Sequence, residues 1–244
     1  MNTACRMMLV SALALSSAAL AAGDGFTKHF PLATCQFTST GGNAYFPLKP
    51  GRQTYFSNAA CVAAGDCDVL DEVWATTKFE VKHIALPIGN GTRDVVARVV
   101  EEFETENGVL TEISRNYFAV CQPTRDVYYF GEDVDVYENG KVVGHDGAWL
   151  TGRNGALPGI ALPEDTFMVG QRYYQEVAPG VALDRAEHKR SAFAVKVPAG
   201  RFDYCASVEE TTPLEPDDIS NKVYCRDIGM VKDDDLELIS VSGD

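Results

Sequence analysis

Short segments in which apolar and polar residues alternate recur along the chain, and they constrain its fold more than any other feature. Examples lie at residues 78–84, 109–113 and 192–197. A period of two is typical of a half-buried strand, and Gly and Pro punctuate these segments as turn residues do. No segment shows a helical period of comparable quality. The sequence therefore predicts an all-β fold: one strongly curved antiparallel sheet or half-barrel, with few short helical turns.

The clearest turn is Asn139-Gly140, which lies between two alternating segments. Both residues tolerate the positive φ angles that a type I′ turn requires, so a β-hairpin is predicted around them. Opposing residues in such a hairpin have a constant sum of residue numbers. This register places Phe130 opposite Trp149 on the predicted core face, and Asp133 opposite Asp146 on the other face.

Three other segments carry weaker signals. Residues 68–77 and 164–167 could each form a helical turn or two. The proline-bounded apolar stretch at 155–163 is predicted to cross the sheet as a connection, because proline is a poor residue for a central strand. No linker or repeat divides the chain after residue 21, so residues 22–244 are expected to form a single β-rich domain.

Residues 1–21 have the pattern of a secretory signal peptide. Arg6 precedes an apolar stretch, and Ala19-Leu20-Ala21 forms a small-x-small cleavage pattern. No later run reaches 18 apolar residues, so no transmembrane segment is predicted. The expected location is the periplasm or the extracellular space.

Six cysteines follow residue 21, an even number that favours three disulfides in an exported chain. Cys61 and Cys67 enclose a short loop, and Cys205 and Cys225 lie symmetrically about a turn-like segment at 213–218. Six cysteines allow 15 pairings. The predicted pairs are Cys35 with Cys121, Cys61 with Cys67, and Cys205 with Cys225.

Composition and motifs exclude several functions. The chain has 21 basic and 35 acidic residues and a formal charge of −14. This balance disfavours a sequence-independent grip on nucleic acid or on an anionic membrane, because phosphate binding needs clustered Lys and Arg. The four His residues have no HExxH spacing, and there is no Gly-x-Ser-x-Gly or phosphate-binding glycine loop. Zinc catalysis, a nucleophile-elbow serine and nucleotide binding are therefore unsupported.

Four motifs carry a resemblance: YFGEDV at 129–134, NGKVV at 139–143, GAW at 147–149 and GALPGI at 155–160. They resemble a large group of exported bacterial proteins of unknown function, and the likeness covers most of the chain after residue 21. The segments at 197–202 and 227–231 are also similar to periplasmic half-barrel proteins of the lipoprotein-carrier kind. The resemblance implies export and a curved sheet, but it implies no settled activity.

Aromatic residues near the apolar stretch at 155–163 could line a pocket, although strand cores also favour aromatics. The leading interpretation is an exported, non-enzymatic binding or envelope-associated protein. It would hold an apolar or amphipathic ligand on the concave face of the sheet. The candidate ligand-binding residues are Tyr129, Phe130, Trp149, Leu157 and Tyr174.

Two alternatives use carboxylates. Asp133, Asp135 and Asp146 would share one face of the hairpin, where a calcium ion could offset their repulsion, or they could form a solvated acidic surface. A secreted hydrolase would instead need two carboxylates across a cleft. The candidates for that role are Glu176, Asp184, Glu187, Glu209, Glu210 and Glu215.

Overall fold

The structure is a computed structural model that describes residues 25–65, 67–164 and 168–243. The predicted signal peptide at 1–21 and most of the helical turn predicted at 164–167 lie outside these residues. Among the described residues, no helix is long and apolar enough to cross a membrane.

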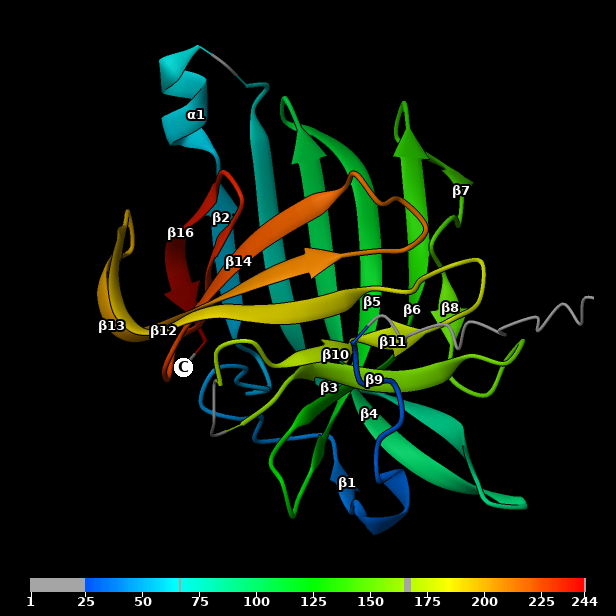
Figure 1. Cartoon of the computed structure of the whole chain (residues 1–244). Coiled ribbons are helices and arrows are strands. Elements are labelled where there is room, and N and C mark those ends of the chain that lie inside the picture. The colour runs from blue at the N-terminus through cyan, green and yellow to red at the C-terminus, as the bar shows by residue number, and fades with distance from the viewer. Residues whose placement is uncertain (1–24, 66, 165–167, 244) are drawn as a thin grey trace, which may run out of the picture.

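One antiparallel sheet contains every strand (Figure 1). The strands are β1 (Phe37–Thr38), β2 (Gln53–Ser57), β3 (Leu70–Ile88), β4 (Gly91–Glu106), β5 (Val109–Cys121), β6 (Val127–Glu138), β7 (Lys141–Gly144), β8 (Trp149–Leu150), β9 (Leu157–Leu162), β10 (Arg172–Tyr174), β11 (Glu176–Val177), β12 (Arg185–Val197), β13 (Gly200–Thr211), β14 (Ile219–Cys225), β15 (Gly229–Asp233) and β16 (Leu236–Ser242). The helical elements are the 3₁₀ turn η1 (Leu32–Thr34) and the helix α1 (Ala59–Ala64). The predicted all-β class and antiparallel sheet are confirmed.

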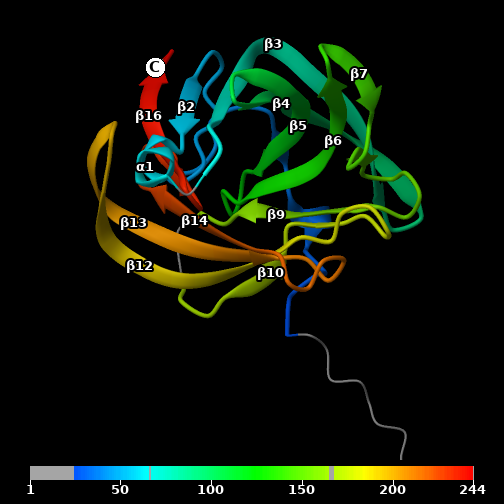
Figure 2. The same ribbon diagram turned by 90° about the horizontal axis from the view of Figure 1, so that it is seen from above.

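The main path through the sheet runs β10-β12-β13-β14-β15-β16-β2-β3-β4-β5-β6-β9-β11, and it is not closed into a barrel. Most neighbours on this path are consecutive strands joined by short turns. The sheet coils strongly, so that β12, β13 and β14 pass across from β4, β5 and β6 (Figure 2). Residues far apart in sequence therefore face one another across the concave side.

All three predicted disulfides are confirmed. Cys35 pairs with Cys121 at the end of β5, Cys61 with Cys67 beside α1, and Cys205 with Cys225 in the register of β13 and β14. Cys35, Cys121, Cys205 and Cys225 are fully or almost fully buried. The largest core cluster packs the N-terminal segment against the long strands, with its partly buried Phe30, Leu32 and Phe37 at the edge.

The register predicted for the Asn139-Gly140 hairpin holds only near the turn. Glu138 pairs with Lys141 and Tyr137 with Val142, but the register then shifts. Trp149 consequently lies opposite Glu132 and not opposite Phe130. Close backbone contact explains the need for glycine nearby, since a Cβ on Gly131 would lie 2.5 Å from the Trp149 carbonyl oxygen.

Two further predictions about local structure are wrong. Residues 68–77 are not helical, because β3 begins at Leu70 and its alternation continues the sheet; the helix α1 precedes this segment instead. The stretch at 155–163 contains strand β9, which lies between β6 and β11. Its Pro158 is tolerated because it pairs with the two-residue strand β11 close to the sheet edge.

Candidate functional site

Two adjoining cavities lie on the concave side of the sheet. The larger, about 250 Å³, is rich in carboxylates, and we call it the acidic cavity. The smaller, about 60 Å³, is mainly apolar, and we call it the apolar cavity. Phe46, Trp74 and Tyr224 line both. The two cavities therefore adjoin at these three side chains, one of them mainly apolar and the other rich in carboxylates.

Strands β3, β4 and β5 build one wall of the acidic cavity through their alternating side chains. Cross-strand pairing places Glu104 opposite Glu72 on one side and opposite Glu112 on the other. One step along, Glu102 lies between Trp74 and Ser114 in the same way. Like charges directly opposite one another destabilise a sheet, so this wall carries an electrostatic cost.

The facing wall contributes Lys222, the one basic side chain among the described residues that line the acidic cavity. The Lys222 ammonium on β14 lies 3.1 Å from Glu210 and 3.2 Å from Asp233. Burial alone would lower the pKa of Lys222, but these two carboxylates outweigh it and hold the pKa well above its ordinary value. The seven lining carboxylates are Glu102, Glu104, Glu112, Glu132, Glu176, Asp184 and Glu210.

Burial and mutual repulsion perturb these carboxyl groups. Burial, helped by the charge of Asp233, raises the pKa of Glu72 to about 7. Burial also raises the pKa of Glu132 to about 7 and that of Glu176 well above its usual range. Burial and the neighbouring Glu72 raise the pKa of Glu102 well above its ordinary value, which favours its protonated form. The described residues that line the acidic cavity therefore carry far fewer positive charges than carboxyl groups.

These shifts predict that the protein is more stable in mild acid than in mild base. The folded-state pKa values of Glu72 and Glu132, about 7, exceed their ordinary 4.5, so folding takes up protons between these values. The free energy of unfolding therefore falls as the pH rises through this window. We expect a higher Tm at about pH 5 than at about pH 8. The double variant Glu72→Gln, Glu132→Gln should flatten the profile, whereas the exposed Glu106→Gln should leave its slope unchanged.

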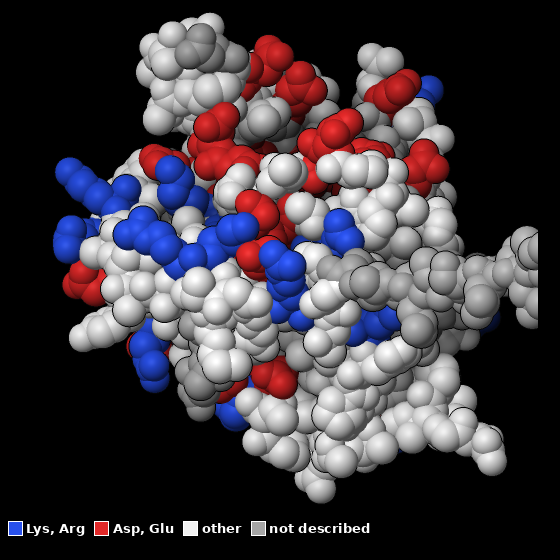
Figure 3. Space-filling view, in the orientation of Figure 1, with Lys and Arg blue, Asp and Glu red and all other residues white. Residues whose placement is uncertain are grey.

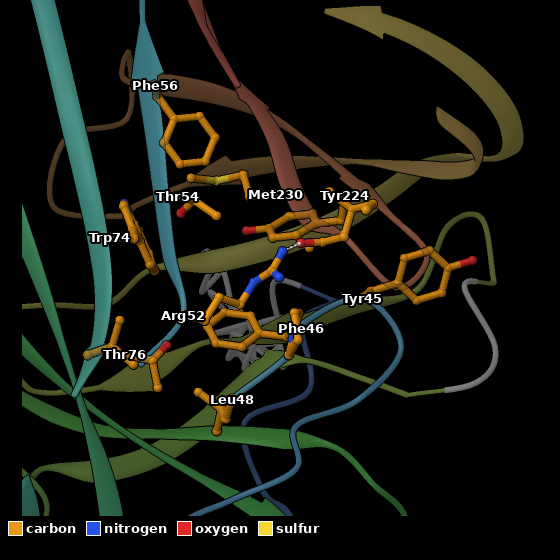
Figure 4. A pocket seen from close by; sticks show the side chains of 14 residues that line it. Tyr45, Phe46, Leu48, Arg52, Thr54, Phe56, Trp74, Thr76, Tyr224 and Met230 are labelled. Carbon is orange, nitrogen blue, oxygen red and sulfur yellow. Dashed lines mark hydrogen bonds between the residues drawn. The ribbon is translucent and has the colours of Figure 1, made fainter. Parts of the chain in front are cut away.

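The apolar cavity lies between the N-terminal segment and the strands β2, β3, β14 and β15 (Figure 4). Phe56, Trp74 and Met230 approach it from one side and Phe46 and Leu48 from the other. Its charged lining residue is Arg52, which is 4% exposed and donates a hydrogen bond of 2.5 Å to the Ile228 carbonyl. Because the Arg52 guanidinium binds a backbone carbonyl, a ligand in the apolar cavity would contact mainly aromatic and aliphatic side chains.

Only one predicted ligand-binding residue lines this site. The Tyr129 ring lies in the acidic cavity, stacks on Phe118 at 4.9 Å, and donates a 2.6 Å hydrogen bond to Asn116. Trp149 packs edge-on against the outer side of that ring. The remaining candidates, Phe130, Leu157 and Tyr174, also lie outside both linings.

The three predicted calcium ligands do not gather around a common point. Asp133 accepts a hydrogen bond from Tyr117 and forms a 3.0 Å ion pair with Lys82. Asp135 pairs with Arg115 at 2.9 Å. The register shift removes Asp146 from its predicted place opposite Asp133. Within the described part of the chain, no cluster of three metal-ligating side chains contains any of these aspartates.

The predicted hydrolase carboxylates divide between two sides of the sheet. Glu176, Asp184 and Glu210 line the acidic cavity. Glu187 and Glu209 both contact Lys189, at 3.5 and 3.0 Å, away from the cavity, and Glu215 is exposed in the β13–β14 loop.

The carboxylates of β4 and β5 were not predicted as site residues from the sequence. Their signal was present, since Val100, Glu102 and Glu104 share one strand face and Glu112 follows the next turn. Glu101 obscured it, because it alternates onto the opposite face, where it lies 3.8 Å from Arg115.

Comparisons with protein-family models, with curated proteins and with solved structures found no match.

Proposed function

We propose that this chain is an exported binding protein that holds an amphipathic, positively charged ligand on the concave face of its sheet. The ligand would place its apolar part in the apolar cavity and its ammonium-type group among the carboxylates. Three disulfides support a role in an oxidising compartment, outside the cytoplasm.

The observation that carries this proposal is that the apolar cavity and the acidic cavity adjoin at Phe46, Trp74 and Tyr224. An apolar ligand would fill the apolar cavity but leave the carboxylate repulsion unrelieved. A small cation would do the reverse. A ligand with both parts gains apolar burial beside Trp74 and Tyr224 and charge compensation beside Glu102.

Charge balance also favours a cationic end over an anionic one. Lys222 is already engaged by Glu210 and Asp233, and seven carboxylates line the acidic cavity. A bound ammonium group would favour the ionised forms of Glu102 and Glu132, which burial now disfavours. An anion would instead add to the repulsion.

Native mass spectrometry tests this function on the protein as a cell makes it. The oxidised protein should be purified gently from an exporting host, and its native mass compared with its denatured mass. We expect a non-covalent adduct that ionises as an amine. The variant Glu102→Gln, Glu132→Gln should lose most of the adduct.

The matched control for this loss is Glu101→Gln. Glu101 neighbours Glu102 on β4 but contacts Arg115 on the opposite face. The Glu101→Gln variant should retain the adduct at the wild-type level. Equal loss in both variants, or an adduct that is a fatty acid, would contradict the proposal.

A hydrolase is a second candidate, and one observation favours it. Glu102 and Glu132 both line the acidic cavity and burial raises the pKa of both, and such carboxyl groups can supply a general acid at neutral pH beside ionised ones. Release of reducing sugar from an extracellular polysaccharide by the wild type, lost in Glu102→Gln and retained in Glu101→Gln, would establish this alternative.

A further inference from the structure

The β12–β13 hairpin contains two strained residues at a sharp bend. Ala192 and Tyr204 have φ angles of 55° and 57°, although neither is glycine. The register shifts on both sides of the Phe193–Cys205 pair, as opposed β-bulges do. Such backbone conformations cost stability and are found at functional sites. Here the bend leaves the Tyr204 side chain 68% exposed.

The same hairpin concentrates positive charge. The whole hairpin, residues 185–211, contains five basic and four acidic side chains, but its distal part, residues 189–203, contains four basic side chains and one acidic side chain, within a chain of net charge −14. Lys196 lies directly opposite Arg201, a like-charge pair that costs stability in a sheet. The Arg190 guanidinium lies over the Phe193 ring at 4.3 Å. Among the described residues, neither Arg190 nor Lys196 forms an ion pair, whereas Arg201 lies 3.3 Å from the exposed Asp203.

Basic and acidic side chains are distributed unevenly over the face seen in Figure 3, although some acidic side chains lie among the basic ones. In the orientation of Figure 1, basic side chains spread over β12, β13 and β14, and acidic ones gather at the upper side (Figure 3). At 0.1 M ionic strength, exposed charges separated by more than about 10 Å are largely screened. The local charge of the hairpin therefore outweighs the net charge in a contact that involves the hairpin alone.

The shape of this region favours a broad surface as its partner. The acidic cavity meets the hairpin at Glu210, but neither cavity is lined by Arg190, Lys196, Arg201 or Tyr204, and the exposed face of the hairpin is the outer side of a bent ribbon. An exposed tyrosine on a hairpin that also carries long cationic side chains suits a phospholipid interface, where a phenol ring lies at the headgroup level and cations meet phosphates.

We propose that the bent β12–β13 hairpin docks this protein on an anionic phospholipid surface. Arg190, Lys196 and Arg201 contact phosphate groups, and Tyr204 lies at the headgroup boundary. These four residues lie outside the linings of both cavities, so docking can be tested independently of ligand binding.

Vesicle sedimentation tests the proposal. The oxidised protein from an exporting host is mixed with vesicles of phosphatidylcholine alone, or of phosphatidylcholine and phosphatidylglycerol in equal parts. We expect binding only to the anionic vesicles, weakened by added salt. Arg190→Glu, Lys196→Glu should lower the partition coefficient by more than about tenfold. Tyr204→Ser should weaken binding without changing the salt dependence.

The matched control is Lys141→Glu, Arg153→Glu, which makes the same charge change at exposed positions away from the hairpin. It should keep binding within about twofold of wild type, because its sites do not face the bilayer. The milder Arg190→Gln, Lys196→Gln serves if the reversal variant unfolds. Equal binding to both kinds of vesicle, an equal loss in the control, or retention only by immobilised polyglutamate would overturn the proposal.

Discussion

Replacing Lys222 by Met is expected to lower the free energy of unfolding by about 3 kcal/mol at neutral pH. The methionine keeps the length of the side chain but removes the ammonium that Glu210 and Asp233 share. Both carboxylates would then stay poorly solvated without a counter-charge. Removing one partner of a buried ion pair is costly for this reason. Urea denaturation followed by far-UV circular dichroism measures the loss.

Acid should rescue this variant, which separates the charge effect from lost packing. Lys222 also helps to lower the pKa of Glu72, which lies at about 7, so the deficit should shrink as Glu72 is protonated below about pH 7. The control is Lys232→Met, which removes a 2.9 Å ion pair with Glu237 whose side chains are 34% and 21% exposed. That surface pair should be worth less than about 1 kcal/mol. A deficit in Lys222→Met that is independent of pH would contradict the role given to the carboxylates.

The double variant Cys35→Ala, Cys121→Ala is expected to lose about 4.5 kcal/mol. This disulfide joins residues 86 positions apart and anchors the N-terminal segment to the end of β5. Cross-linking so long a loop removes much of the entropy of the unfolded chain. Small domains are stable by only about 5–15 kcal/mol, so the variant should be close to unfolding at 37 °C. Thermal and urea denaturation measure the change.

The control is Cys61→Ala, Cys67→Ala, whose disulfide joins residues only 6 positions apart beside α1. The same chain-entropy argument predicts a loss of about 2 kcal/mol. If both double variants lost the same stability, loop length would not explain the contribution of the disulfides.

Local patterns predicted the elements of this fold well. The alternating segments became long strands, and the cysteine spacing led to the correct pairs, because both depend on residues near one another in the chain or on a common register. The Asn139-Gly140 turn set the first two pairs of its hairpin. Beyond them, the register shifts, so that Trp149 lies two positions away from its predicted partner, and no local sequence pattern predicts such a shift.

The candidate site depended on information that alternation does not contain. Glu101 and Glu102 are equivalent as sequence, but the coiling of the sheet puts Glu102 inside and Glu101 outside. Glu210 and Lys222 reach the same cavity only because β13 and β14 pass across from β4 and β5. The strand positions of these carboxylates could be predicted from the sequence. Their meeting in one cavity could not, because it depends on how strongly the sheet curves.

The central claim, that the concave face binds an amphipathic cation, is tested most directly by tryptophan fluorescence. The chain has two tryptophans, and Trp74 lines both cavities whereas Trp149 lines neither. In Trp149→Phe, only Trp74 reports. Octylamine, octanol and octanoate share an apolar tail and differ in the charge of the head group. We expect saturable changes with octylamine at least about tenfold tighter than with octanol, and weakest binding of octanoate. Equal responses to all three, or tightest binding of octanoate, would contradict the account.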